Sequence, residues 1–144
     1  MTPDQADYFR VPLLDGRFGL GQVFELPELV GETGLFCGLT SRIAAQDTQP
    51  APFALSDVIA FCRIAPDHIT SGTWPLAGFD QIPVFRGVFD YEGHRALGFP
   101  DHPVQDPAVI EAFLNAWHGL YPWDSFGPLF DRMLRDGVSR PAAG

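Results

Sequence analysis

Two histidines in the second half of the chain are the residues most suggestive of chemistry. His94 and the pair Asp101-His102 lie within nine residues of each other, so a hairpin between them would bring them together. His68 and His118 stand alone, and no histidines or cysteines have the short ligand spacing of a known metal site. Because a third anchored ligand is missing, the pattern predicts no metal site, and we expect no cofactor.

A second possible source of chemistry is the carboxylate pair Asp90 and Glu92. At this spacing two side chains of an extended strand share one face, where a carboxylate pair can perform general acid–base chemistry. The neighbouring turn favours a solvated surface pair instead. Cys62 lies in an apolar run that would bury its thiol, and no serine has the Gly-x-Ser-x-Gly context of a hydrolase. We therefore expect no catalytic residues.

The absence of lysine excludes further classes of enzyme. A phosphate-binding P-loop and a Schiff base both require that residue. The glycines between Gly16 and Gly21 partly match a dinucleotide-binding loop, but they follow a predicted hairpin turn and lead into a strand rather than a helix.

Charge is the strongest compositional feature. Eighteen acidic residues face nine arginines, a net charge of −9, which repels nucleic acid and anionic membranes and favours a basic protein partner. Acidity alone equally suits solubility. The stretch from Asp90 to Asp124 has six acidic residues against Arg95 alone, a balance of −5. These six are the candidate partner-binding residues: Asp90, Glu92, Asp101, Asp106, Glu111 and Asp124.

The first half of the chain predicts short strands. Tyr8 to Leu14 and Arg17 to Leu26 flank Asp15-Gly16, which is typical of a hairpin with a type I′ turn. Gly16, Gly19 and Gly21 predict the bends that a small barrel needs. Further strands are expected at Leu35 to Thr40, Val58 to Ile64 and Ile69 to Leu76, with a loop over 44–56.

A second hairpin and two helices are expected to follow. Pro83 to Tyr91 and His94 to Phe99 would form the hairpin. Asp106 is a suitable N-cap for an apolar-striped helix that stops at Gly119. Ser125 would cap a shorter helix that ends at Asp136-Gly137.

These elements predict an α+β fold. We expect a small, strongly bent antiparallel sheet or partly open barrel of six to eight strands, followed by two C-terminal helices. The chain, 1–144, would be a single domain with a β-rich part (8–99), a helical part (106–136) and a frayed tail (137–144). The N-terminus is unlike a signal peptide, and Cys37 and Cys62 are expected to be buried free thiols, so the sequence indicates a cytoplasmic protein.

One resemblance connects these features to a function. The runs YFRVPLLDGRFGLGQVFEL and VIAFCRIAPDHITSGTWPLAGF resemble the immunity protein 26 family of bacterial polymorphic toxin systems, over residues 8 to about 80. The resemblance rests on Asp15 to Gly19, on Gly21, and on the spacing of Gly72, Trp74 and Gly78. It implies a cytoplasmic antidote that binds and neutralises a cognate toxin, and it implies no catalytic residues.

Three hypotheses follow from the sequence. The first is a non-enzymatic immunity protein, monomeric or weakly dimeric, that binds a toxin domain, possibly a nuclease, with a basic surface. The second is a small-ligand-binding or regulatory barrel whose phenylalanines line a pocket. The third is a hydrolase that uses His94, His102, Asp90 and Glu92, which requires these side chains to converge.

Overall fold

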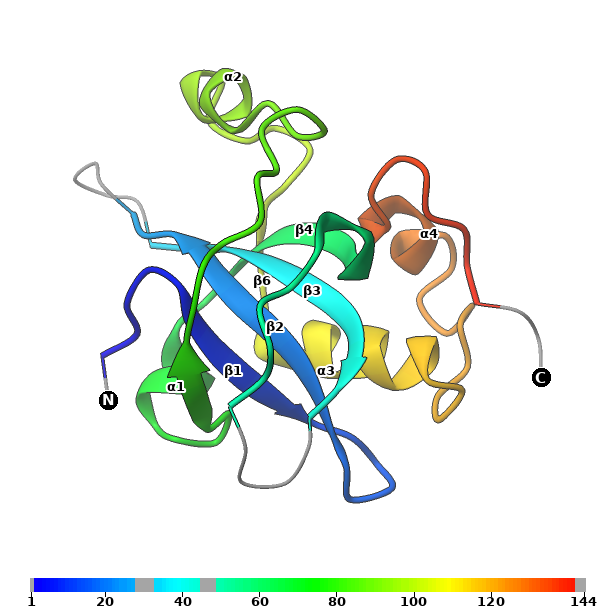
Figure 1. The fold of residues 1–144 in the computed structure, drawn as a ribbon. Helices are drawn as coiled ribbons and strands as arrows, with labels where there is room; N and C mark the ends of the chain where they lie inside the picture. The colour runs from blue at the N-terminus through cyan, green and yellow to red at the C-terminus, as the bar shows by residue number, and fades with distance from the viewer. Residues whose placement is uncertain (1, 28–32, 45–48, 142–144) are drawn as a thin grey trace.

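Six strands form one open sheet in the computed structural model of the chain, which describes residues 2–27, 33–44 and 49–141 (Figure 1). The strands are β1 (Asp7–Pro12), β2 (Phe18–Glu25), β3 (Leu35–Ile43), β4 (Val58–Ile64), β5 (Leu76–Phe79) and β6 (Val104–Gln105). Their order is β5-β1-β2-β3-β4-β6, and every neighbouring pair is antiparallel except β4 and β6. The α+β class is confirmed. The predicted barrel or strongly bent sheet is wrong, because the short edge strands β5 and β6 do not pair and the sheet stays open.

The helices are short and lie mostly in the second half of the chain. They are η1 (Leu55–Asp57), α1 (Asp67–Thr70), α2 (Tyr91–Ala96), α3 (Pro107–Trp117) and α4 (Leu129–Met133). The predicted N-cap of α3 is confirmed, since the Asp106 side chain accepts a hydrogen bond from the Ala108 amide. Ser125 does not cap α4; its hydroxyl donates to the Pro122 carbonyl instead. No helix within the described ranges is long and apolar enough to cross a bilayer.

The first hairpin is present, but its turn differs from the predicted type. Only Gly16 has a positive φ (86°), whereas a type I′ turn needs positive φ at both central residues. The Gly16 amide donates to the Leu13 carbonyl, and the Leu13 amide donates to the Arg17 carbonyl. The connection is therefore a three-residue loop that ends in a left-handed glycine, the second common way to close a hairpin.

Two other predicted strand segments are helical. Ile69 and Thr70 lie in α1, so the strand begins only at Leu76. The second hairpin is also wrong, because its expected turn and the first half of its return strand form α2. Asp90 determines this outcome: its carboxylate accepts a hydrogen bond from the Gly93 amide and caps the helix.

The sheet is buried on both faces. On one face a large core contains Val23, Cys37 and Leu39, covered by Phe113 of α3 and Phe130 of α4. On the other face Phe24, Phe36 and Phe61 lie beneath aromatic residues that come from the segment between β5 and β6. Strand alternation places consecutive residues such as Val23 and Phe24 on opposite faces. The continuous apolar sequence of β4 follows from this double burial.

The cysteines and tryptophans belong to the core on the α3 face. Cys37 and Cys62 lie opposite each other on β3 and β4 as buried free thiols, as predicted, and burial raises the pKa of both. Trp74 is fully buried, stacks on Phe9 and donates its indole N–H to Glu111. Trp117 and Trp123 are partly buried against the same core.

The glycines of the central strands make room for aromatic rings. A Cβ atom at Gly21 would collide with the ring of Phe9, its partner across the β1–β2 ladder. A Cβ atom at Gly38 would collide with the ring of Phe24 on the opposite face. Gly21 and Gly38 therefore make room for packing between strands, and the β2–β3 register also shifts between Gly19 and Gly21, at two of the glycines predicted to mark a bend.

We predict that Gly38→Ala lowers the free energy of unfolding by about 1–3 kcal/mol, because the Phe24 ring must shift in a filled core. Gly87→Ala is the matched control, since a Cβ atom there meets no atom within 4 Å. The control should be neutral or raise stability by up to about 1 kcal/mol. Urea denaturation of both variants measures the difference, and equal stabilities would contradict the packing role of Gly38.

Candidate functional site

An irregular segment, residues 80–90, crosses the face of the sheet opposite α3 (Figure 1). We call it the strap. It leaves β5 after Phe79 and leads into α2. Its central part is a single helical turn, in which the amides of Val88 and Phe89 both donate to the Phe85 carbonyl. The strap is therefore an ordered structure that covers the second face of the sheet.

Aromatic rings join the strap to the sheet. Phe85 stacks on Phe24 with ring centroids 4.9 Å apart, and Phe89 packs 5.0 Å from Phe36. Tyr91, the first residue of α2, lies 4.8 Å from the same Phe36 ring. Ring pairs of this kind contribute about 0.5–1.5 kcal/mol each beyond their burial. Phe36 is thus the centre on which the strap and α2 both pack.

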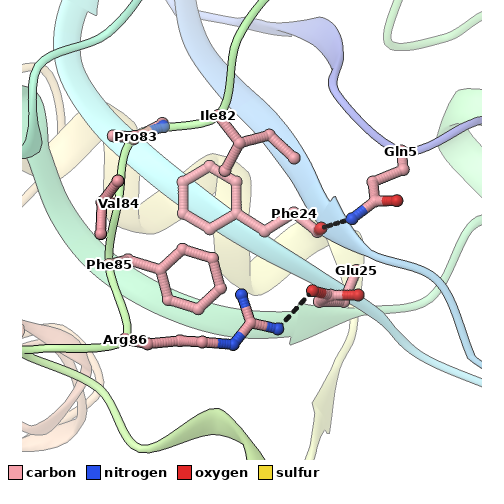
Figure 2. A pocket seen from close by; sticks show the side chains of 8 residues that line it. All are labelled: Gln5, Phe24, Glu25, Ile82, Pro83, Val84, Phe85 and Arg86. Carbon is pink, nitrogen blue, oxygen red and sulfur yellow. Dashed lines mark hydrogen bonds and ion pairs between the residues drawn. The ribbon is translucent and has the colours of Figure 1, made fainter.

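Arg86 connects the strap to β2 and to α2 through two ion pairs. Its Nη2 lies 2.7 Å from Glu25 Oε1 on β2, and its Nε lies 2.7 Å from Glu92 Oε1 on α2. Figure 2 shows the guanidinium reaching from the strap to Glu25, beside the ring of Phe85. These hydrogen bonds raise the pKa of Arg86, and its guanidinium lowers the pKa of the Glu92 carboxyl. One side chain therefore connects the strap, the sheet and α2.

Four large apolar side chains are exposed on the strap and on the elements that it joins, β5 and α2. Val84 is 85% exposed, Leu97 77%, Phe79 69% and Val88 47%. These are four of the six exposed large hydrophobic residues in the described part of the chain. Figure 2 shows the Val84 side chain directed away from the Phe24 ring, toward which Ile82 points. Exposed apolar side chains that share one segment, as Val84 and Val88 share the strap, are typical of interaction surfaces.

Three hollows border the strap, and Ile82 lines all of them. The first, about 280 Å³, lies between the strap and β2 and is drawn in Figure 2. The second, about 380 Å³, lies between the strap and residues 52–55. The third, about 540 Å³, lies where Gln5 and Ala6 meet the start of the strap. The strap thus forms a ridge with recesses along it.

The structure brings His94 and His102 together. Their rings pack edge to face 5.2 Å apart, and Phe89 stacks on His94 at 4.6 Å. The Nδ1 atom of His102 is buried without a hydrogen-bond partner. Burial, followed by the positive influence of His94, lowers the pKa of His102; Asp101 raises it to a smaller extent, and Arg63 lowers it slightly further.

This histidine pair does not form the acid–base group of the hydrolase hypothesis. Asp90 caps α2 and Glu92 binds Arg86, so neither carboxylate is hydrogen-bonded to an imidazole. Among the described residues there is no group of three side chains that could hold a metal ion.

The six acidic residues proposed for partner binding do not gather on one surface. Asp90 and Glu92 lie exposed at the start of α2, beside the strap, and Asp101 is exposed in the turn after it. Asp124 lies in the loop before α4, which is well separated from α2 in Figure 1.

The other acidic positions have structural partners on the α3 side. Asp106 caps α3, and the half-buried Glu111 accepts the Trp74 indole N–H at 2.8 Å. Asp124 pairs with Arg140 at 3.1 Å. Asp90, Glu92 and Asp101 are therefore the acidic candidates on the α2 side, although Asp90 also caps α2 and Glu92 also pairs with Arg86.

The strap is the feature that the sequence interpretation missed. The apolar residues Val84, Phe85, Val88 and Phe89 recur at positions 1, 2, 5 and 6, which is a helical rather than an alternating spacing. With Asp90 as an N-cap, this pattern contained the signal for a turn followed by a helix.

Comparison with known proteins adds no assignment. No family model matches the chain, and neither the curated proteins nor the solved structures contain a match. The resemblance of residues 8 to about 80 to the immunity protein 26 family therefore stays a prediction.

We predict that His102 makes the fold less stable in mild acid. The unfolded chain has the ordinary histidine pKa near 6.5, whereas burial lowers the folded pKa, so the unfolded chain takes up the proton first as pH falls. The free energy of unfolding should therefore decline below pH 7. His102→Gln should make that decline shallower. One proton can change the slope by at most about 1.4 kcal/mol per pH unit, and the effect should be smaller than this limit because the ring is partly solvated.

Urea denaturation at pH 7, 6 and 5 measures this slope. His118→Gln should act in the same direction, because burial also lowers the pKa of His118. The double variant should show the smallest decline. Identical slopes in the parent and in His102→Gln would show that the His102 environment is not linked to folding.

Proposed function

We propose that this protein acts by binding a partner protein through the outer face of the strap. The observation that carries the proposal is the exposure of the apolar side chains Val84 and Val88 on the strap, together with the three hollows that border it. Apolar projections next to recesses can interlock with a partner and exclude water, which is how the centres of protein interfaces obtain their affinity.

The packing beneath the strap supports this role. Phe85 and Phe89 are buried against Phe24 and Phe36, and Arg86 is held by two carboxylates. A surface fixed in this way loses little conformational entropy on binding, so more of the contact energy remains as affinity.

The charge of the chain favours a basic partner. The net charge of −9 would accelerate the encounter with a positively charged protein, and Asp90, Glu92 and Asp101 lie near the strap. On the resemblance to immunity proteins, we propose that the partner is a cognate toxin domain with a basic surface. In this role the protein would work in the cytoplasm, without catalysis and without a cofactor.

A small ligand is the second candidate, and one observation favours it. The hollow of about 280 Å³ is lined by Phe24, Ile82 and Phe85 and by the polar side chains of Gln5 and Glu25, the mixture found in ligand pockets. A saturating ligand would raise the melting temperature. A thermal-shift screen of metabolite classes tests this function, and no response in any class would exclude it.

We predict that Val84→Asp weakens binding to the partner at least about tenfold, because a charge would be buried at the centre of the interface. Val88→Asp should act in the same direction. The control is Leu14→Asp, which alters another exposed apolar residue (71%) on the β1–β2 loop, away from α2 in Figure 1. It should change affinity less than about twofold.

The measurement is calorimetric titration with the toxin domain encoded beside this gene, together with survival of cells that co-express the two proteins. Loss of binding and of protection in the strap variants, but not in Leu14→Asp, supports the proposal. Equal affinity in all variants would place the interface elsewhere, and absence of a toxin domain beside the gene would remove the immunity role.

A further inference from the structure

The third hollow differs in chemistry from the other two. It lies at the edge of the sheet where β5 meets β1, and its volume is about 540 Å³. Its lining consists of Gln5, Ala6, Phe79, Asp80, Gln81 and Ile82, and thus contains no basic residue. An exposed aromatic ring and a carboxylate therefore share one recess.

The carboxylates around this hollow are not neutralised. Asp80 lines it, Asp7 pairs with Phe79 across the β1–β5 ladder, and the Asp4 amide donates to the Asp7 carboxylate. None of the three forms an ion pair with a residue in the described ranges, unlike Glu25 and Glu92, which share Arg86. Three uncompensated negative charges near one recess attract a cation.

Buried oxygens without partners lie behind the same hollow. Gln22 is fully buried, and its Nε2 donates to the carbonyls of Ala6 and Asp80, two residues of the lining, at 3.0 and 2.9 Å. Its Oε1 has no hydrogen-bond partner, and neither has the hydroxyl of Tyr8, the residue opposite on β1. Buried polar atoms are nearly always paired, so the Gln22 oxygen behind this hollow lacks a donor, and the Tyr8 hydroxyl lacks a partner of either kind.

The electrostatic surroundings of Tyr8 agree with this description. Burial, and then the negative charge of Asp80, raise the pKa of its hydroxyl. Arg42 is the one cation that opposes them, and its guanidinium lies 5.2 Å over the ring of Phe53 and donates to the Ala51 carbonyl. Arg42 is thus held by other groups and does not supply the missing donor.

We propose that this hollow receives an arginine side chain of the partner protein. A guanidinium carries only donors, so it matches a recess that is lined by the Asp80 carboxylate and has two further carboxylates, Asp4 and Asp7, close by in the chain. Its plane can lie on the Phe79 ring, which is 69% exposed, while its N–H groups face Asp80. The inference rests on the proposed function, because it identifies a chemical group through which a basic partner would be recognised.

The test is a titration of the full-length, ¹⁵N-labelled protein with N-acetylarginine amide, followed by NMR. We expect saturable shifts at the side-chain amide of Gln22 and at the backbone amides of Phe79 and Gln81, with a dissociation constant in the millimolar range, which is about −4 kcal/mol. N-acetylcitrulline amide, which has the same shape without the charge, should bind at least about tenfold more weakly.

Two variants and one control locate the site. Asp80→Asn and Phe79→Ala should each weaken binding at least about threefold, and Leu14→Ala should have no effect. Phe79 is exposed, so its variant should fold even if Asp80→Asn does not. No saturable shift up to about 50 mM, equal binding of citrulline, or shifts unaffected by both variants would overturn the arginine site.

This outcome is separable from that of the proposed function, because the titration needs no partner. An absent arginine site leaves docking on Val84 and Val88 as a separate question. If arginine binds and the Val84→Asp variant keeps full affinity for the toxin domain, the recess stands and the strap interface fails.

Discussion

The structure depends on the need to bury both faces of the central sheet. Strands β2, β3 and β4 carry large apolar side chains on both faces, and the helices α3 and α4 cover only one of them. The other face would expose Phe24, Phe36 and Phe61 to water without the strap, and a fully buried phenylalanine contributes about 1.5–3 kcal/mol. The strap is therefore part of the core, although it contains almost no regular structure.

The double burial also explains the exposed residues. A segment of eleven residues that inserts Ile82, Phe85 and Phe89 into one face must direct the intervening side chains outward. Val84 and Val88 occupy such positions. Their apolar side chains are therefore available to the proposed interface.

Local sequence signals predicted part of this fold correctly. The apolar run of β4, the Asp106 cap of α3 and the first hairpin each depend on neighbours in the chain. The open sheet could not be predicted in the same way. It depends on β6, a strand of two residues that pairs with β4 in parallel across about forty positions of sequence.

The candidate site was predictable only in part. Charge balance selected six acidic residues between Asp90 and Asp124, but the structure shows that several of them bind neighbouring groups: Glu92 pairs with Arg86, Glu111 accepts from Trp74 and Asp124 pairs with Arg140. The sequence shows that a residue is acidic, but it does not show whether its carboxylate is already paired with another group of the same protein. The carboxylates around Asp80 and Asp7 were overlooked because they come from segments more than seventy residues apart, joined only by the pairing of β5 with β1.

The distribution of the tryptophans has a practical consequence for optical studies. Trp74, Trp117 and Trp123 all pack in the core that contains α3, whereas the strap and its aromatic floor contain only phenylalanine and tyrosine. Indole emission will therefore follow the melting of one half of the molecule and respond weakly to events on the other. The substitution Val88→Trp would place an indole on the strap, next to Phe89. Its fluorescence would then report on the face of the sheet opposite α3.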